Sequence, residues 1–103
     1  MHPVVRKSLQ DILARLACHR EALQQQFGVR RLGLFGSRVR NDFREDSDID
    51  ILVVFEQSPG WEIVDLKTYL EDLLREPVDL VTENAVRRRP LLWDSIQQEL
   101  VYV

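Results

Sequence analysis

Residues 35–51 read Phe-Gly-Ser-Arg-Val-Arg-Asn-Asp-Phe-Arg-Glu-Asp-Ser-Asp-Ile-Asp-Ile, and an apolar run continues to Phe55. Acidic and apolar residues alternate at the end of this stretch, so a strand here places the carboxylates of Asp48 and Asp50 on one face, roughly 6.6 Å apart along the chain. The run that follows is apolar enough to predict a buried central strand. Charged side chains at the start of such a buried strand cost free energy unless a cation compensates them. Because magnesium usually takes one or two carboxylates plus phosphate oxygens, the pair is a candidate magnesium site.

A Gly-Ser turn precedes this acidic pair by ten residues. The sequence predicts a strand over residues 29–35 that ends at Gly36, and a short helix that Ser37 caps and that begins near Arg38. Gly36 has no side chain, so phosphate oxygens could approach its backbone, where N–H groups and the serine hydroxyl would donate. Arg38 or Arg40 could add positive charge. The turn and the acids together predict a site for a nucleoside triphosphate and magnesium.

The pattern apolar-Gly-Ser, ten residues, Asp-apolar-Asp-apolar resembles the signature of the DNA polymerase beta type nucleotidyltransferase superfamily. It is most similar to the minimal members, the MNT-domain antitoxins that pair with HEPN-domain toxins. The resemblance covers nearly the whole chain and implies one minimal nucleotidyltransferase domain, residues 1–103, with an α/β fold in which helices flank a small mixed sheet. It implies a third carboxylate on a neighbouring strand, and Asp79 in the short apolar run 77–81 fills that position. Many relatives carry glycine where this chain has Asn41, but asparagine tolerates left-handed backbone, so we expect the turn to be kept.

The resemblance implies two-metal nucleotidyl transfer. Asp48 and Asp50 would hold the magnesium that binds the triphosphate, and Asp79 would complete a second magnesium site where an acceptor hydroxyl loses its proton. The resemblance further implies ATP as the donor and a tyrosine hydroxyl of a HEPN-type ribonuclease toxin as the acceptor, so that attached AMP blocks the toxin. The predicted nucleotide-binding residues, with Asp46 as a weaker candidate beside them, are Gly36, Ser37, Arg38 and Ser47.

Length and composition restrict the partners. A chain of 103 residues can build one small domain but not an added domain that grips a primer, template or drug. A net charge of -3 argues against an extensive nucleic-acid surface, since phosphate backbones are held mainly by basic surfaces. We therefore expect another protein to bring the acceptor, in a possible homo-oligomer or hetero-oligomer.

The single cysteine and the hydropathy predict a cytoplasmic protein. Cys18 has no partner for an intrachain disulfide, which favours a reducing compartment, and we expect it to pack as a small apolar group. The N-terminal segment is charged and amphipathic, unlike a signal peptide. No apolar run approaches the roughly 20 residues that a membrane crossing needs, so no membrane association is expected.

The remaining periodicity predicts four helices around the small sheet. Apolar residues recur at helical spacing, Pro3 and Pro90 suit the first turns of helices, and Pro77 stops one. Residues 82–84 are predicted as a turn. The long predicted helices cover residues 3–26, residues 61–75 and the segment from Pro90, and the predicted strands cover residues 29–35, 49–55 and 77–81.

Alternatives to catalysis remain open. The fold could serve only as a binding module that neutralises a toxin by association, although a pure binder gains nothing from three uncompensated acids. Nucleotides could instead pass to a small molecule, with a partner subunit supplying the pocket. The run 87–89 of three arginines could reach a triphosphate or an acidic partner, but such short runs are usually solvated surface. Trp61 and Trp93 could stack on an adenine, but aromatic residues at helical spacing more often anchor a core or an interface.

Overall fold

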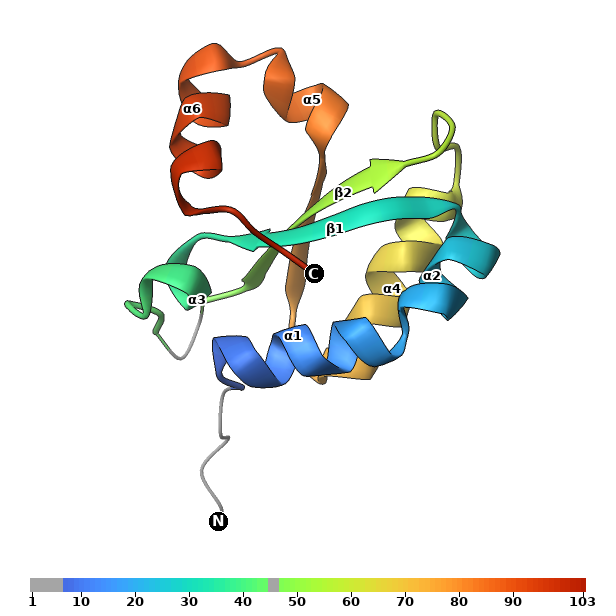
Figure 1. Ribbon diagram of the computed structural model, residues 1–103, viewed down its shortest axis with the longest axis horizontal. Coiled ribbons are helices and arrows are strands. Elements are labelled where there is room, and N and C mark those ends of the chain that lie inside the picture. The colour runs from blue at the N-terminus through green and yellow to red at the C-terminus, as the bar shows by residue number, and fades with distance from the viewer. Residues whose placement is uncertain (1–6, 45–46) are drawn as a thin grey trace.

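The computed structural model describes residues 7–44 and 47–103, in which a four-stranded mixed sheet lies between two groups of helices (Figure 1). The strands follow the order β3-β2-β1-β4 across the sheet. The central strand β2 runs antiparallel to β1 and parallel to β3, and β4 pairs antiparallel with β1. This arrangement confirms the predicted α/β fold with a small mixed sheet. The strands span Val29–Phe35 (β1), Ile49–Phe55 (β2), Val78–Thr82 (β3) and Val101–Tyr102 (β4).

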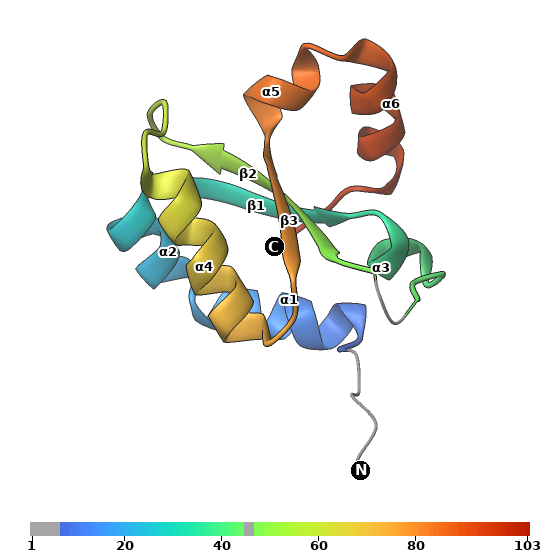
Figure 2. The ribbon, with the colours of Figure 1, turned by 180° about the vertical axis from the view of Figure 1, so that it is seen from behind.

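The helices divide between the two faces of the sheet. Three of them, α1, α2 and α4, lie below the sheet in Figure 1, and α5 and α6 lie above it. The short helix α3 follows β1 at one end of the sheet. Figure 2 shows β3 beside β2 and leading into α5. The helices span Leu9–Cys18 (α1), Arg20–Phe27 (α2), Ser37–Arg40 (α3), Glu62–Leu74 (α4), Glu83–Arg87 (α5) and Pro90–Glu99 (α6).

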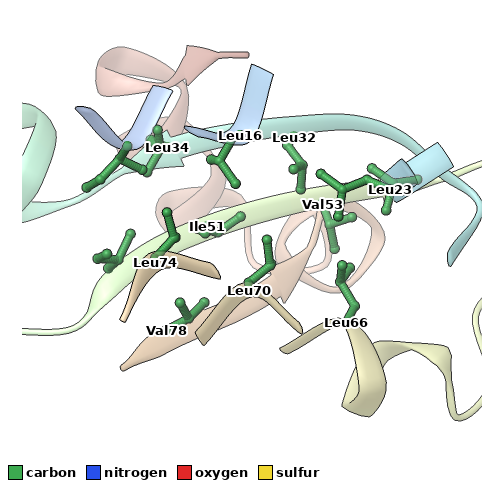
Figure 3. Packing of buried hydrophobic residues seen from close by; sticks show 13 residues of the cluster. Leu16, Leu23, Leu32, Leu34, Ile51, Val53, Leu66, Leu70, Leu74 and Val78 are labelled. Carbon is green, nitrogen blue, oxygen red and sulfur yellow. The ribbon is translucent and has the colours of Figure 1, made fainter. Parts of the chain in front are cut away.

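Alternation along β2 assigns its side chains to two apolar clusters. Ile49, Ile51 and Val53 are fully buried and pack in the larger cluster, against helices α1, α2 and α4 (Figure 3). Leu52 points the other way, into a smaller cluster with Val86 and Ile96 from α5 and α6. Each buried aliphatic side chain of this size contributes roughly 1.5–3 kcal/mol. Both faces of β2 are therefore covered, as predicted for a buried central strand.

The long N-terminal helix predicted over residues 3–26 is two helices. Residues 3–6 lie outside the described residues, and α1 begins only after Ser8, whose hydroxyl accepts from the backbone N–H of Asp11 at 3.2 Å. The chain turns at His19, and α2 then continues to the left-handed Gly28. Both helices bury leucines against the same sheet, so apolar residues recur at helical spacing on both sides of the break and do not reveal it.

The prediction that Cys18 packs inside is wrong, because its thiol is exposed. Cys18 follows the buried Leu16 by two residues, which is about 200° around a helix, so it faces away from the sheet.

Two elements were not predicted. Residues 82–84, predicted as a turn, open α5, because the Thr82 hydroxyl accepts from the N–H of Ala85 at 3.2 Å and caps the helix. The last residues form β4, which pairs with Gly33 and Leu34 of β1. Among the described residues, none of the helices combines the length and the apolar character that crossing a membrane requires.

Candidate active site

The structure brings the three predicted aspartates together at one end of the sheet. Asp48 directly precedes β2, and Asp50, its second residue, shares the face of Leu52. Asp79 is the second residue of β3 and lies beside Asp50 in the parallel register. Its neighbour Val78 is buried against the opposite helices, so Asp79 also points to the α5–α6 side. The three carboxylates therefore share one face on neighbouring chain segments.

The electrostatic effect of this arrangement is seen in the pKa of Asp50. Burial is the main cause that raises the pKa of Asp50 from 3.8 to about 6, and the charges of Asp79 and Asp48 raise it further. The guanidinium of Arg40 acts in the opposite direction. A partly buried carboxylate between two others is an arrangement that a cation would stabilise.

The aspartate carboxylates fit a magnesium site only if a substrate supplies further oxygen ligands. Within the described residues, no three Asp, Glu, His or Cys side chains converge closely enough to surround one ion by themselves. Magnesium binds hard oxygen ligands and usually leaves several of its positions to phosphate oxygens and water. The carboxylates of Asp48 and Asp50 match that requirement.

Gly36 lies directly against the acids. Its φ of 80° is in the left-handed region, and a Cβ at this position would collide with the Asp50 carboxylate, lying 2.9 Å from its Cγ. Phe35, the residue before it, pairs with Asp50 across β1 and β2. Both the backbone conformation and the space therefore require glycine, and the turn and the acid form one site.

The start of α3 differs in one detail from the prediction. Gly36 occupies the cap position and Ser37 is the first helical residue, so Ser37 does not cap the helix. Asn41 ends the helix in left-handed conformation, with φ 63° and ψ 34°, which confirms that asparagine keeps the turn. The Ser37 hydroxyl stays a predicted nucleotide contact, one residue from the glycine that borders Asp50.

Arg38 is not at the site. Its side chain is fully buried, and its guanidinium donates to the Glu76 carboxylate at 2.6 Å and to the backbone oxygen of Lys7 at 3.1 Å. The guanidinium also stacks on the Phe43 ring, 4.3 Å from its centroid. These contacts tie α3 to the α1–α4 layer. The nucleotide contact predicted for Arg38 does not suit a side chain that is held there.

Arg40 is the arginine that faces the acids. Two residues along a helix turn the side chain by about 200°, so Arg40 points away from the layer that holds Arg38. One of its Nη atoms donates to both carboxylate oxygens of Glu99, at 2.9 and 3.2 Å, and its Nε donates to Asp42 at 3.1 Å. The sequence analysis named Arg38 as a nucleotide contact and Arg40 only as a possible additional charge, whereas the structure places Arg40, and not Arg38, against Glu99.

Glu99 was missed by the sequence analysis. It is the last residue of α6, and its Oε1 accepts the backbone N–H of Gly36 at 3.0 Å while also binding Arg40. Its charge contributes to the raised pKa of Asp50. A carboxylate in the last turn of a helix opposes the helix dipole, and this local conflict was the available signal.

Ser47 shapes the approach to the first aspartate. Its hydroxyl accepts the backbone N–H of Arg44 at 2.9 Å, and its own N–H donates to the Arg44 carbonyl at 3.0 Å. These bonds link Ser47 to Arg44 just before Asp48, while the nucleotide contact of Ser47 stays a prediction. Asp46 lies outside the described residues.

The other candidates have contacts of their own or face solvent. Arg87 bonds Glu83 at 3.5 Å and stacks over the Trp93 ring, 5.1 Å from its centroid. Trp93 packs on the smaller apolar cluster, as expected of a core aromatic residue. Trp61 is 84% exposed at the start of α4, so it is not part of the core.

Comparison with known proteins places this site in a family. The family model described as nucleotidyltransferase domain matches residues 16–103. The protein adenylyltransferase MntA of Thermococcus cleftensis is 41% identical over 97 residues, which cover 93% of this chain and 96% of that protein. A candidate protein adenylyltransferase of Methanocaldococcus jannaschii is 39% identical over 98 residues, which cover 94% of this chain and 99% of that protein.

Solved structures show the same fold. A candidate minimal nucleotidyltransferase has a TM-score of 0.76 at 33% identity, covering 95% of this chain and 98% of that one. A toxin–antitoxin crystal structure with AMP-PNP has a TM-score of 0.65 at 22% identity, covering 82% of this chain and 69% of that one, and shares the fold. The chain described here therefore belongs to the nucleotidyltransferase domain family and is a nucleotidyltransferase enzyme.

Proposed function

We propose that this enzyme transfers AMP from ATP to a hydroxyl group on a partner protein. The observation that carries the proposal is the meeting of Asp50 with Asp79 on one side and with Gly36 on the other, which places acids beside a glycine turn. The relative from T. cleftensis is named a protein adenylyltransferase. A toxin–antitoxin complex with AMP-PNP has the same fold, which supports a nucleotide substrate and a toxin partner.

Different residues have different roles in the proposed transfer. One magnesium would be held by Asp48, Asp50 and the triphosphate, and Asp79 would complete a second magnesium position. Both ions would neutralise charge on the phosphate oxygens. The backbone N–H of Gly36 would donate to the phosphates, and Arg40 would supply the positive charge that Arg38 cannot. The acceptor oxygen attacks the α-phosphorus and loses its proton beside Asp79. The bond from the α-phosphorus to the bridging oxygen breaks, and pyrophosphate leaves.

The proposed acceptor is a tyrosine hydroxyl of a HEPN-type ribonuclease toxin, which the attached AMP would silence. The signature over residues 35–51 supports this choice. The proposed transfer needs no covalent nucleophile and no histidine base, because it depends on positioning and on charge stabilisation. The cytoplasmic location stays a prediction.

The decisive test is Asp79→Asn. Asp48 and Asp50 keep their places, so the variant should still bind ATP and associate with the partner, while AMP transfer falls by roughly a hundredfold or more. Intact-mass spectrometry of the co-expressed toxin would report the adduct as an increase of one AMP per chain. Asp72→Asn on α4 makes the same change at an exposed position in the opposite helix layer, and should leave transfer unchanged.

Toxicity assays separate the enzyme from the binding module. If the Asp79→Asn protein neutralises the toxin fully without adding AMP, association is the biological mechanism and the proposed function is wrong. A small-molecule acceptor would instead appear as ATP consumption that leaves the toxin mass unchanged.

A further inference from the structure

Glu99 already occupies the donors that a triphosphate would use. Its Oε1 accepts the Gly36 N–H at 3.0 Å, and both of its oxygens accept from Arg40, at 3.2 and 2.9 Å. The side chain is 19% exposed, so it lies mostly inside the site. Its charge also reaches Asp50, whose pKa it raises. A carboxylate therefore lies where the proposed function needs phosphate oxygens.

The position of Glu99 is fixed by the residues that follow it. Leu100 packs so closely over Gly33 that a Cβ on this glycine would lie 3.3 Å from the Leu100 Cγ and closer still to its Cδ1. The next two residues pair with β1 as strand β4. The guanidinium of Arg31 stacks on the ring of Tyr102, 3.8 Å from its centroid. Glu99 is thus held at the junction between α6 and an anchored strand.

Two anions cannot share one set of donors in a partly buried site. Like charges at this separation repel, and the acids at Asp48, Asp50 and Asp79 already add negative charge. Entry of a triphosphate at Gly36 and Arg40 therefore requires Glu99 to release them. In this structure the same carboxylate satisfies the Gly36 N–H and holds Arg40 in place.

We propose that Glu99 is an internal competitor of the triphosphate, a positioning residue that holds the phosphate donors and sets the affinity for nucleotide. The proposal rests on the proposed function, because it takes Gly36 and Arg40 as phosphate contacts. A tethered carboxylate acts at a high effective concentration, so a single phosphate competes with it poorly. A triphosphate that also binds magnesium at the aspartates gains enough contacts to displace it. Glu99 thereby favours magnesium-bound triphosphate over smaller anions.

Isothermal titration of the full chain with a nonhydrolysable ATP analogue at saturating magnesium tests this inference. Glu99→Gln keeps the shape of the side chain but removes its charge, so the analogue should bind about tenfold more tightly, and inorganic phosphate should gain affinity as well. Arg40→Met should weaken binding. In the Arg40→Met background the gain from Glu99→Gln should shrink, because part of the competition acts through Arg40.

Glu83→Gln is the matched control. Glu83 has a 17% exposed side chain, bonds an arginine as Glu99 does, and lies past the far end of β3 from Asp79, so its substitution should leave the affinity unchanged. Thermal unfolding of each variant checks that the fold is kept. Unchanged or weaker binding by Glu99→Gln overturns the inference, while transfer of AMP by the parent would leave the proposed function intact. If neither the parent nor Glu99→Gln binds the analogue, both proposals fail.

Discussion

The two faces of the sheet use the same strand for opposite purposes. Toward α1, α2 and α4, β2 presents Ile49 and Ile51, fully buried in the larger apolar cluster. Toward α5 and α6, the residue between them is Asp50, whose pKa rises to about 6 because it is partly buried among acids. The first face is apolar along the whole strand. The second holds charge at Asp50 at a cost to stability, and only from Leu52 onward does it join the smaller apolar cluster.

The largest effect should come from removing the central acid. Asp50→Asn takes away the carboxylate that adjoins both Asp79 and Gly36, so AMP transfer should fall by roughly a thousandfold. The melting temperature should not fall, because the substitution removes a repelling charge. AMP transfer and thermal unfolding would be measured on the same samples. Persistent transfer, or a large fall in melting temperature, would contradict the assignment of Asp50 to chemistry and not to folding.

The two arginines of α3 test the same separation of stability from chemistry, because they lie two residues apart and face different layers. Arg38→Met removes the guanidinium that bonds the buried Glu76 carboxylate and should cost about 3 kcal/mol of unfolding free energy. Arg40→Met changes a half-exposed side chain and should cost little stability, while it weakens nucleotide binding. Urea unfolding and nucleotide titration of both variants would refute the assignment if the two effects were exchanged.

The smallest expected effect is a pH dependence of stability. The folded-state pKa of Asp50 is raised from 3.8 to about 6, so the folded protein binds this proton more tightly than the unfolded chain does. Its contribution to stability is therefore full below pH 4 and is lost as the pH rises toward about 6. Solvent screening limits the loss to about 1 kcal/mol. In metal-free buffer, the difference in stability between the parent and Asp50→Asn should change over this window and be constant above it.

The strands that carry the site could be predicted from the sequence because their signals are local. The alternation after Asp48 and the stop at Gly36 gave residues 29–35 and 49–55, which the structure confirms. The break at His19 could not be predicted, because both helices present leucines to the same sheet and the apolar period continues across it.

The remaining parts of the site depend on contacts between distant residues. The different roles of Arg38 and Arg40 depend on the position of Glu76, and the contact between Glu99 and Gly36 joins residues that are 63 positions apart. No local pattern encodes such pairs. The sequence therefore identified the acids and the turn but not the groups that hold the turn.

The parallel pairing of β2 with β3 has a consequence for how the site is assembled. Parallel neighbours cannot be joined by a tight turn, and here the connection passes through α4. Chain synthesis delivers Gly36, Asp48 and Asp50, at the adjoining ends of two antiparallel strands, well before Asp79 is made, and Glu99 comes later still. An emerging chain thus holds the turn and two acids before it has the third acid or the carboxylate that covers the donors. The order of the residues along the sequence is also the order in which the site can be completed.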